Sequence, residues 1–176
     1  MPPIFLLGFM GSGKSHIGRL LSEHLCLSFL DLDHVLETHE GRKIADIFSK
    51  EGEIFFRNLE TETLKNFGNS SYTVVSLGGG APCFNNNMAL VKQLGISFYL
   101  QAPAEVLAQR LFSERAHRPI LHNTTEESFV GFIEGKLVER NPFYTQANYS
   151  INASQKDADI VRDIERILLK AHAYRQ

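Results

Sequence analysis

The feature that most constrains this chain is a glycine-rich stretch that directly follows a short apolar run near the N-terminus. The run covers residues 4–7, and residues 8–15 read G-x-x-x-x-G-K-S. Glycines let successive backbone N–H groups turn toward a polyphosphate, while Lys14 supplies a positive charge and Ser15 a hydroxyl for a magnesium ion. A helix starting there would direct the positive end of its dipole at the phosphates. The stretch therefore predicts a nucleoside triphosphate site, and the alternative is a glycine turn with a chance Lys-Ser.

Short apolar runs and amphipathic stretches alternate along the rest of the chain. After the phosphate loop, Ile17, Leu20, Leu21 and Leu25 recur at three- and four-residue steps, which predicts a helix with one buried face. Alternation of this kind is typical of an α/β fold in which helices cover a parallel sheet. At 176 residues and 43% hydrophobic content the chain suits a single domain. The five runs that predict strands are residues 4–7, 28–30, 74–77, 96–100 and 149–151.

Composition argues against several classes of partner. The formal charge is −2 and there is no long run of lysine or arginine, so neither nucleic acid nor a membrane surface is expected as a partner. The short apolar run before the phosphate loop fits neither a signal peptide nor a membrane span, which predicts a cytoplasmic protein. Cys26 and Cys83 lie in different elements, and the seven histidines lack ligand spacing, so no disulfide framework or transition-metal site is expected. A self-sufficient core makes a monomer the default.

Two aspartates follow the second apolar run. Ligands gather at the carboxyl ends of parallel strands, and Asp31 and Asp33 stand at such an end. Their spacing of two predicts that both carboxylates project from one side of an extended chain toward Lys14. A carboxylate there can hold a magnesium-bound water or accept a hydrogen bond from an attacking hydroxyl. The alternative is that Asp33 only caps the following helix.

An arginine and a glycine cluster come next. Arg57 and Glu60 stand three apart on a helix expected to open at Gly52, close enough for an ion pair. The planar fork of arginine suits a carboxylate ligand, and the alternative is a solvated surface arginine. Residues 78–80 are three glycines after the third run, which expose backbone amides and let a ligand approach the main chain.

Two further arginines are candidates. Residues 113–127 are polar and lack a sustained period, which predicts a mobile loop, and this loop carries Arg118. A cation on such a loop can close over a triphosphate, or it can be merely solvated. Arg140 lies near the last turn of a helix expected to end at Pro142, where it could also be a purely structural helix-end cation.

Taken together, these motifs resemble the shikimate kinase family, within the nucleoside-monophosphate-kinase-like P-loop proteins. The resemblance implies a three-layer fold with a five-stranded parallel sheet of order 2-3-1-4-5, a helical substrate-binding region at residues 33–61 and a lid at residues 112–127. It also implies transfer of phosphate from ATP to the 3-hydroxyl of shikimate. The matching segments are residues 8–15, 31–33, 52–60, 78–80, 118–121 and 140–144.

On the acceptor side, the resemblance implies a role for individual residues. Asp33 would hold the hydroxyls of shikimate and orient, or deprotonate, the nucleophile. Arg57 and Arg140 would clamp the shikimate carboxylate from two sides, and the amides of Gly79 and Gly80 would complete the pocket.

On the donor side, the resemblance implies that Ser15, and Asp31 through water, bind Mg²⁺. Lys14 and Arg118 would neutralise the transferred phosphoryl group, so the catalytic residues would be these two and Asp33. The expected ATP-binding residues are Gly11, Ser12, Gly13, Lys14, Ser15, His16, Arg110, Arg118 and Ser154.

Two other functions remain open at this point. A gluconate-type or nucleotide kinase would share the phosphate loop, although two separated arginines beside an aspartate favour a compact polyhydroxylated carboxylate. A nucleotide-dependent switch is the second alternative. The chain has no Asn-Lys-x-Asp guanine signature, and the residues on the substrate side would have no purpose in a switch.

Overall fold

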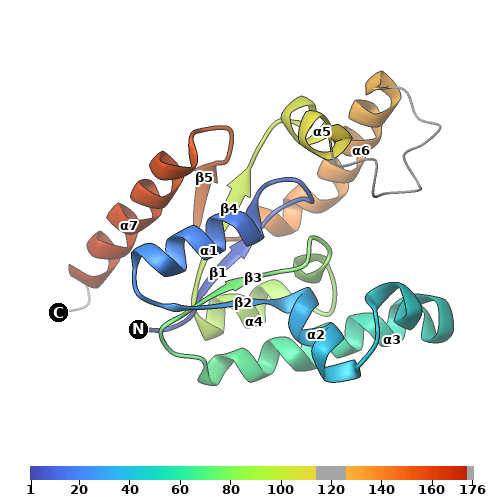
Figure 1. Ribbon diagram of the computed structural model, residues 1–176, viewed down its shortest axis with the longest axis horizontal. Helices are drawn as coiled ribbons and strands as arrows, with labels where there is room; N and C mark the ends of the chain where they lie inside the picture. The colour runs from blue at the N-terminus through green and yellow to red at the C-terminus, as the bar shows by residue number, and fades with distance from the viewer. Residues whose placement is uncertain (114–125, 174–176) are drawn as a thin grey trace.

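One sheet of five parallel strands forms the centre of the fold in a computed structural model, which describes residues 1–113 and 126–173 (Figure 1). The strand order is β2-β3-β1-β4-β5, so the expected α/β fold and its strand order are confirmed. β1 pairs with β3 on one side and β4 on the other, with Leu6 opposite both Ser76 and Phe98. The strands are β1 (Ile4–Leu7), β2 (Ser28–Asp31), β3 (Thr73–Ser76), β4 (Ile96–Gln101) and β5 (Tyr149–Asn152).

Burial follows the position of each strand in the sheet. All four residues of β1 and of β3 are buried, as expected for parallel strands covered on both faces. The edge strands β2 and β5 are more exposed. The core is therefore centred on β1, and the phosphate loop leaves the sheet at its middle.

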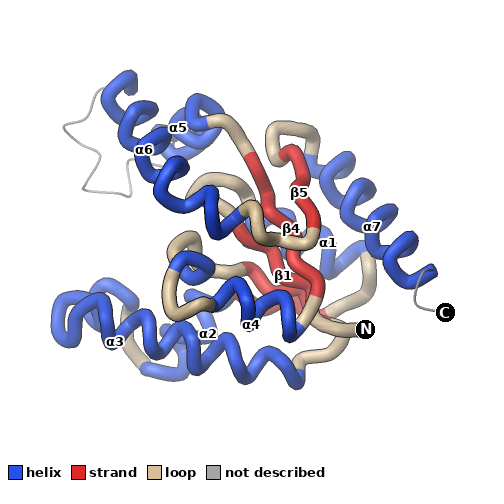
Figure 2. The backbone as a smooth tube through the Cα atoms, turned by 180° about the vertical axis from the view of Figure 1, so that it is seen from behind, coloured by secondary structure: helices blue, strands red, loops and turns tan. Residues whose placement is uncertain are grey.

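Helices cover both faces of the sheet. α1 and α7 lie on one face, and α4 lies on the other, as the two opposite views show (Figures 1 and 2). None of the helices in the described part of the chain combines the length and hydrophobicity that a membrane span requires. The helices are α1 (Lys14–His24), α2 (Leu32–Glu40), α3 (Ile44–Asn66), α4 (Asn87–Leu94), α5 (Ala104–Ser113), α6 (Glu126–Tyr144) and α7 (Asp157–Ala173), with short 3-10 turns η1 (Phe67–Asn69) and η2 (Ala81–Cys83).

Two helix pairs flank the carboxyl ends of the strands. α2 and α3 pack together on one side, and α5 and α6 pack together on the other (Figure 1). α3 is broken at Gly52, whose φ of 81° and ψ of 175° interrupt the helix, so a new helical segment begins before Arg57 as expected. The phosphate loop, the glycine cluster and both helix pairs therefore meet at one edge of the sheet.

The expectation that Asp31 and Asp33 share an extended chain is wrong. β2 ends at Asp31, and α2 begins at Leu32. The carboxylate of Asp31 accepts hydrogen bonds from the backbone N–H groups of Asp33 and His34, so Asp31 is the N-cap and Asp33 lies in the first helical turn. A capping interaction of this kind ends the strand earlier than the spacing of the carboxylates suggests.

Two expected boundaries also differ from the structure. α6 continues through Pro142 to Tyr144, which places Arg140 one turn before the end of the helix and not at a proline stop. Of the lid expected at residues 112–127, residues 112–113 end α5 and residues 126–127 begin α6. Residues 114–125, with Arg118, lie outside the described residues.

Candidate functional site

The phosphate loop adopts backbone angles that require glycine. Gly8, Gly11 and Gly13 have φ values of 144°, 77° and 89°. A Cβ atom on Gly8 would lie 2.7 Å from the carbonyl oxygen of Leu100, so a larger residue cannot fit there. Gly13 is the N-cap of α1 and no side chain caps this helix, which leaves its first N–H groups free to face an anion.

Lys14 lies in a cluster of charges at the carboxyl edge of the sheet. Its Nζ donates a hydrogen bond to the carbonyl oxygen of Phe9 at 3.0 Å. Burial lowers the pKa of Lys14 to about 8, although the carboxylates of Asp33 and Asp31 act in the opposite direction. Arg140 lowers the same pKa through charge repulsion, so its guanidinium is close enough to interact with the lysine. The fold thus gathers residues from three separate parts of the chain.

Oxygen atoms cluster beside the start of α1. The hydroxyl of Ser15 donates to Oδ2 of Asp31 at 2.5 Å, and it lies 3.3 Å from the hydroxyl of Ser76. Ser76 is the last residue of β3 and was not among the expected site residues. Its position at a strand end is the only sequence signal that could have identified it.

A cavity of about 470 Å³ adjoins the phosphate loop. Arg110 bridges its two sides, donating to the carbonyl oxygens of Gly11 at 3.3 Å and of Ala153 at 2.8 Å. Nε2 of His16 lies 2.8 Å from Oδ2 of Asp157. The lining residues are Gly11, Ser12, Gly13, Lys14, Ser15, His16, Ile17, Arg110, Ala153, Asp157 and Ile160.

Among the residues that the structure describes, Ser154 is the expected ATP-site residue that does not line this cavity. Its backbone N–H bonds to Oδ1 of Asn152, and its neighbour Ala153 contributes the wall instead. Asp157 and Ile160 were missed because nothing in their local sequence marks a ligand site.

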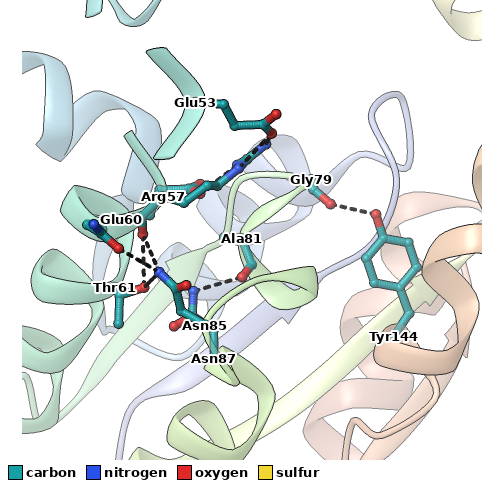
Figure 3. Close-up of polar contacts among 10 residues, drawn as sticks. Glu53, Arg57, Glu60, Thr61, Gly79, Ala81, Asn85, Asn87 and Tyr144 are labelled. Atoms are coloured by element: carbon teal, nitrogen blue, oxygen red, sulfur yellow. Dashed lines mark hydrogen bonds and ion pairs between the residues drawn. The ribbon is translucent and has the colours of Figure 1, made fainter. Parts of the chain in front are cut away.

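Arg57 is held by two glutamates on its own helix (Figure 3). It donates to Oε2 of Glu60 at 2.6 Å, and its Nε and a terminal nitrogen reach Oε1 of Glu53 at 3.2 and 3.0 Å. The expected ion pair with Glu60 is confirmed. The ring of Phe84 lies 4.2 Å from the guanidinium carbon. These three hydrogen bonds leave two of the five guanidinium N–H groups for a ligand.

Asp33 and Glu60 converge over Gly78. A Cβ atom on Gly78 would lie 2.6 Å from Oδ1 of Asp33 and 3.1 Å from Oε1 of Glu60. The side chain of Glu60 is 1% exposed, and burial raises its pKa to about 7 while Arg57 opposes that rise. Burial also raises the pKa of Asp33, with Asp31 adding to the effect and Lys14 opposing it. The residue as a whole remains exposed to solvent, and its carboxylate lies close enough to the ammonium group of Lys14 to interact with it.

The glycine cluster lies between two arginines. A Cβ atom on Gly80 would lie 2.8 Å from both terminal nitrogens of Arg57, and one on Gly79 would lie 3.7 Å from a terminal nitrogen of Arg140. The N–H groups of Gly79 and Gly80 have no hydrogen-bond partner within residues 1–113 and 126–173. Arg140 stacks over Phe9 at 5.2 Å, and no carboxylate in the described ranges pairs with it. Two cations and two free amides thus border one small region beside Asp33.

A model of the protein family described as "Shikimate kinase" matches residues 10–169, which is most of the chain. The chain belongs to the shikimate kinase family. Family membership confirms that the protein is a kinase and that its activity is ATP-dependent phosphorylation of shikimate. A shikimate kinase is therefore a better assignment than either a nucleotide-dependent switch or a gluconate-type kinase.

Individual members of the shikimate kinase family are similar over nearly their whole length. The chain is 39% identical over 171 residues to the shikimate kinase of Flavobacterium psychrophilum, covering 96% of this chain and 99% of that protein. A crystal structure of shikimate kinase from Bacteroides thetaiotaomicron aligns with a TM-score of 0.89 at 34% identity, covering 95% of this chain and 98% of that one. The shikimate kinase from Acinetobacter baumannii, solved in complex with shikimate, aligns with a TM-score of 0.84 at 37% identity, covering 97% and 94%.

Proposed function

We propose that this kinase transfers the γ-phosphoryl group of ATP to the 3-hydroxyl of shikimate, using the residues gathered at the carboxyl edge of its sheet. The observation that carries the proposal is the position of Arg57 and Arg140 beside Gly80 and Gly79, next to Asp33 and the phosphate loop. The complex of the Acinetobacter baumannii enzyme with shikimate supports the same acceptor.

The acceptor site is proposed to bind a carboxylate. Arg57 keeps two N–H groups free, and its ion pairs with Glu53 and Glu60 hold the guanidinium in place. Arg140 has no acidic partner in the described part of the chain, so its charge is available to a ligand. The free amides of Gly79 and Gly80 would complete the contacts to the carboxylate. A sugar-like ring placed there would present its hydroxyls to Asp33.

The donor site is proposed to be the cavity along the phosphate loop. The first turn of α1 and the ammonium group of Lys14 would bind the phosphates, and Arg110 would lie along the base near Ala153. Arg118, outside the described residues, is proposed to neutralise charge on the transferred phosphoryl group with Lys14. Ser154 is proposed only as a neighbour of the adenine pocket.

The oxygen cluster at Ser15 suits Mg²⁺. A hard cation prefers oxygen ligands, and the hydroxyls of Ser15 and Ser76 and the carboxylate of Asp31 all lie together. We place Ser15 as a direct ligand and Asp31 as a ligand through water. When bound, the ion would offset negative charge on the β- and γ-phosphates.

Catalysis then rests mainly on positioning and charge neutralisation. Asp33 would accept a hydrogen bond from the 3-hydroxyl and fix its oxygen in line with the γ-phosphorus. The raised pKa of Asp33 makes it a stronger proton acceptor than an ordinary aspartate, and the charge of Lys14 opposes that rise. We propose that the protein acts as a cytoplasmic monomer on these two small molecules, without nucleic-acid or membrane partners. Light scattering coupled to size exclusion would detect a dimer.

A coupled ADP-release assay with shikimate, gluconate and nucleoside monophosphates tests the proposal. Of the three acceptors, only shikimate should stimulate ADP release from ATP in the presence of Mg²⁺. Stimulation by none of the three would contradict a kinase function.

Site variants test the residue roles. Arg57→Ala and Arg140→Ala should each raise the shikimate KM by about 30-fold or more, a loss of about 2 kcal/mol or more for a charge-assisted contact. Arg118→Ala should lower kcat more than shikimate affinity. Arg162→Ala removes an exposed arginine that pairs with Asp159 and is the matched control, with wild-type kinetics expected.

A further inference from the structure

Tyr144 is a fully buried tyrosine that links α6 to the glycine cluster (Figure 3). It is the last residue of α6, and its hydroxyl donates a hydrogen bond to the carbonyl oxygen of Gly79 at 2.6 Å. The contact joins two segments that are 65 residues apart. Burial raises the pKa of the Tyr144 phenol above its usual range, while the charge of Arg140 opposes the rise. The hydroxyl therefore stays protonated and acts as a donor.

The ring of Tyr144 packs against that of a second tyrosine. The ring of Tyr99, on β4, lies 5.2 Å from that of Tyr144. The hydroxyl of Tyr99 bonds at 2.9 Å to Oδ1 of Asn141, within the last turn of α6. Both tyrosines thus tie the end of α6 to the sheet edge, but only Tyr144 reaches the glycine cluster.

Because a peptide group is planar, the hydrogen bond from Tyr144 to the Gly79 carbonyl also sets the direction of the Gly80 N–H. The carbonyl group of Gly79 and the N–H of Gly80 belong to one trans peptide, so they point in opposite directions. When Tyr144 holds the carbonyl, the N–H of Gly80 faces away from α6, and Gly80 is the glycine that adjoins Arg57. That N–H has no partner in the part of the chain that the structure describes.

The same tyrosine also orients Arg140. The two residues are four apart on α6, so they lie on one face of the helix. Anchoring Tyr144 to Gly79 brings this face against the glycine cluster, where Arg140 lies beside Gly79. One hydroxyl therefore sets both a backbone donor and a cation in the region between the two arginines.

Two asparagines hold the other end of the loop without touching the Gly79–Gly80 peptide. Asn87 donates to the carbonyl oxygen of Ala81 at 2.8 Å, and Asn85 donates to the carbonyl oxygen of Arg57 and to the hydroxyl of Thr61 (Figure 3). The loop stays attached to α3 and α4 when the tyrosine hydroxyl is removed. The orientation of the Gly79–Gly80 peptide and the place of Arg140 beside it then depend on Tyr144.

We propose that Tyr144 is a positioning residue for the acceptor carboxylate, acting through the Gly79–Gly80 peptide and Arg140. The inference rests on the proposed function, because it needs the carboxylate to bind between the two arginines. Tyr144 itself does not have to touch the substrate.

The test is Tyr144→Phe, which removes the hydroxyl and keeps the ring. The shikimate KM should rise roughly tenfold, the loss of about one buried hydrogen bond, with ATP KM unchanged and kcat within about threefold of wild type. Tyr99→Phe is the matched control, because it removes the hydroxyl of the neighbouring ring and leaves the Gly79 contact intact. Its shikimate KM should stay at the wild-type value.

An acceptor analogue separates positioning from a general structural effect. In an analogue with a hydroxymethyl group in place of the carboxylate, Tyr144→Phe and wild type should have the same kcat/KM. An equal loss with shikimate and the analogue, or an unchanged shikimate KM in Tyr144→Phe, would overturn the inference. Failure of the wild-type protein to phosphorylate shikimate would instead contradict the proposed function itself, and the inference would fall with it.

Discussion

Gly78→Ala is the substitution for which the structure gives the most specific expectation. The added Cβ would lie 2.6 Å from Oδ1 of Asp33 and 3.1 Å from Oε1 of Glu60. Glu60 is buried and paired with Arg57, so its carboxylate cannot withdraw freely, whereas the exposed side chain of Asp33 can turn aside and lose its place beside Lys14. The alanine should therefore disturb the proposed catalytic aspartate and the partner of Arg57 together.

The size of the effect follows from these distances. The carboxylate of Asp33 has to withdraw by about 0.8 Å to reach an ordinary contact of 3.4 Å. Overpacking of this kind costs about 1–3 kcal/mol of stability, or roughly 2–12 °C in Tm for a domain of this size. A displacement of the reacting geometry of about 1 Å lowers turnover about 100-fold.

Thermal unfolding and shikimate-dependent ADP release would measure the two effects separately. Gly79→Ala is the control for stability, since its Cβ would make an ordinary 3.5 Å contact with the backbone of Met10. Gly135→Ala, on α6 with nothing within 4 Å of the added atom, is the control for activity and should keep wild-type turnover. A Gly78→Ala variant with wild-type Tm and kcat would refute the close approach of the two carboxylates.

Three other predictions concern the charged groups. In urea unfolding, Arg57→Ala should lower the free energy of unfolding by about 3 kcal/mol, because it leaves the buried carboxylate of Glu60 without its partner. Arg140→Ala should stay within about 1 kcal/mol of wild type. Equal losses in the two variants would contradict the different pairing of the two arginines. The kcat/KM for ATP should decline above pH about 8 as Lys14 loses its proton, and a flat profile up to pH 9.5 would contradict its lowered pKa. The pKa of Glu60 is raised in the folded state, so the folded protein binds the carboxyl proton of Glu60 more tightly than the unfolded chain does. The free energy of unfolding of wild type, relative to that of Glu60→Gln, should therefore fall as pH rises from 4.5 to about 7. Parallel curves of unfolding free energy against pH for the two proteins would contradict the raised pKa.

Much of the fold could be predicted because its signals are local. The buried runs at β1 and β3 and the glycines of the phosphate loop each depend on a few neighbouring residues, so pattern alone identifies them. The boundaries of α2 and α6 could not be predicted in the same way. The spacing of Asp31 and Asp33 suggested an extended chain, but Asp31 caps the helix α2. α6 continues past Pro142, and its last residue, Tyr144, contacts Gly79.

In the site, too, contacts between residues close in sequence could be predicted, and contacts between distant residues could not. The ion pair of Arg57 with Glu60 was predictable because both residues lie on one helix at a spacing of three. Other contacts could not be predicted, because the two partners are distant in sequence. These are the contacts of Ser76 with Ser15, of Asp157 with His16 and of Tyr144 with Gly79. Such contacts depend on the sheet order and on where α6 and α7 lie against the sheet.

The most direct test of the account is a crystal structure of this protein with shikimate and ADP. Electron density should place the shikimate carboxylate between Arg57 and Arg140, within hydrogen-bond distance of the Gly79 or Gly80 amide, and the ring hydroxyls at Asp33. Density with the carboxylate turned away from both arginines, or with the hydroxyls out of reach of Asp33, would contradict the proposed acceptor site.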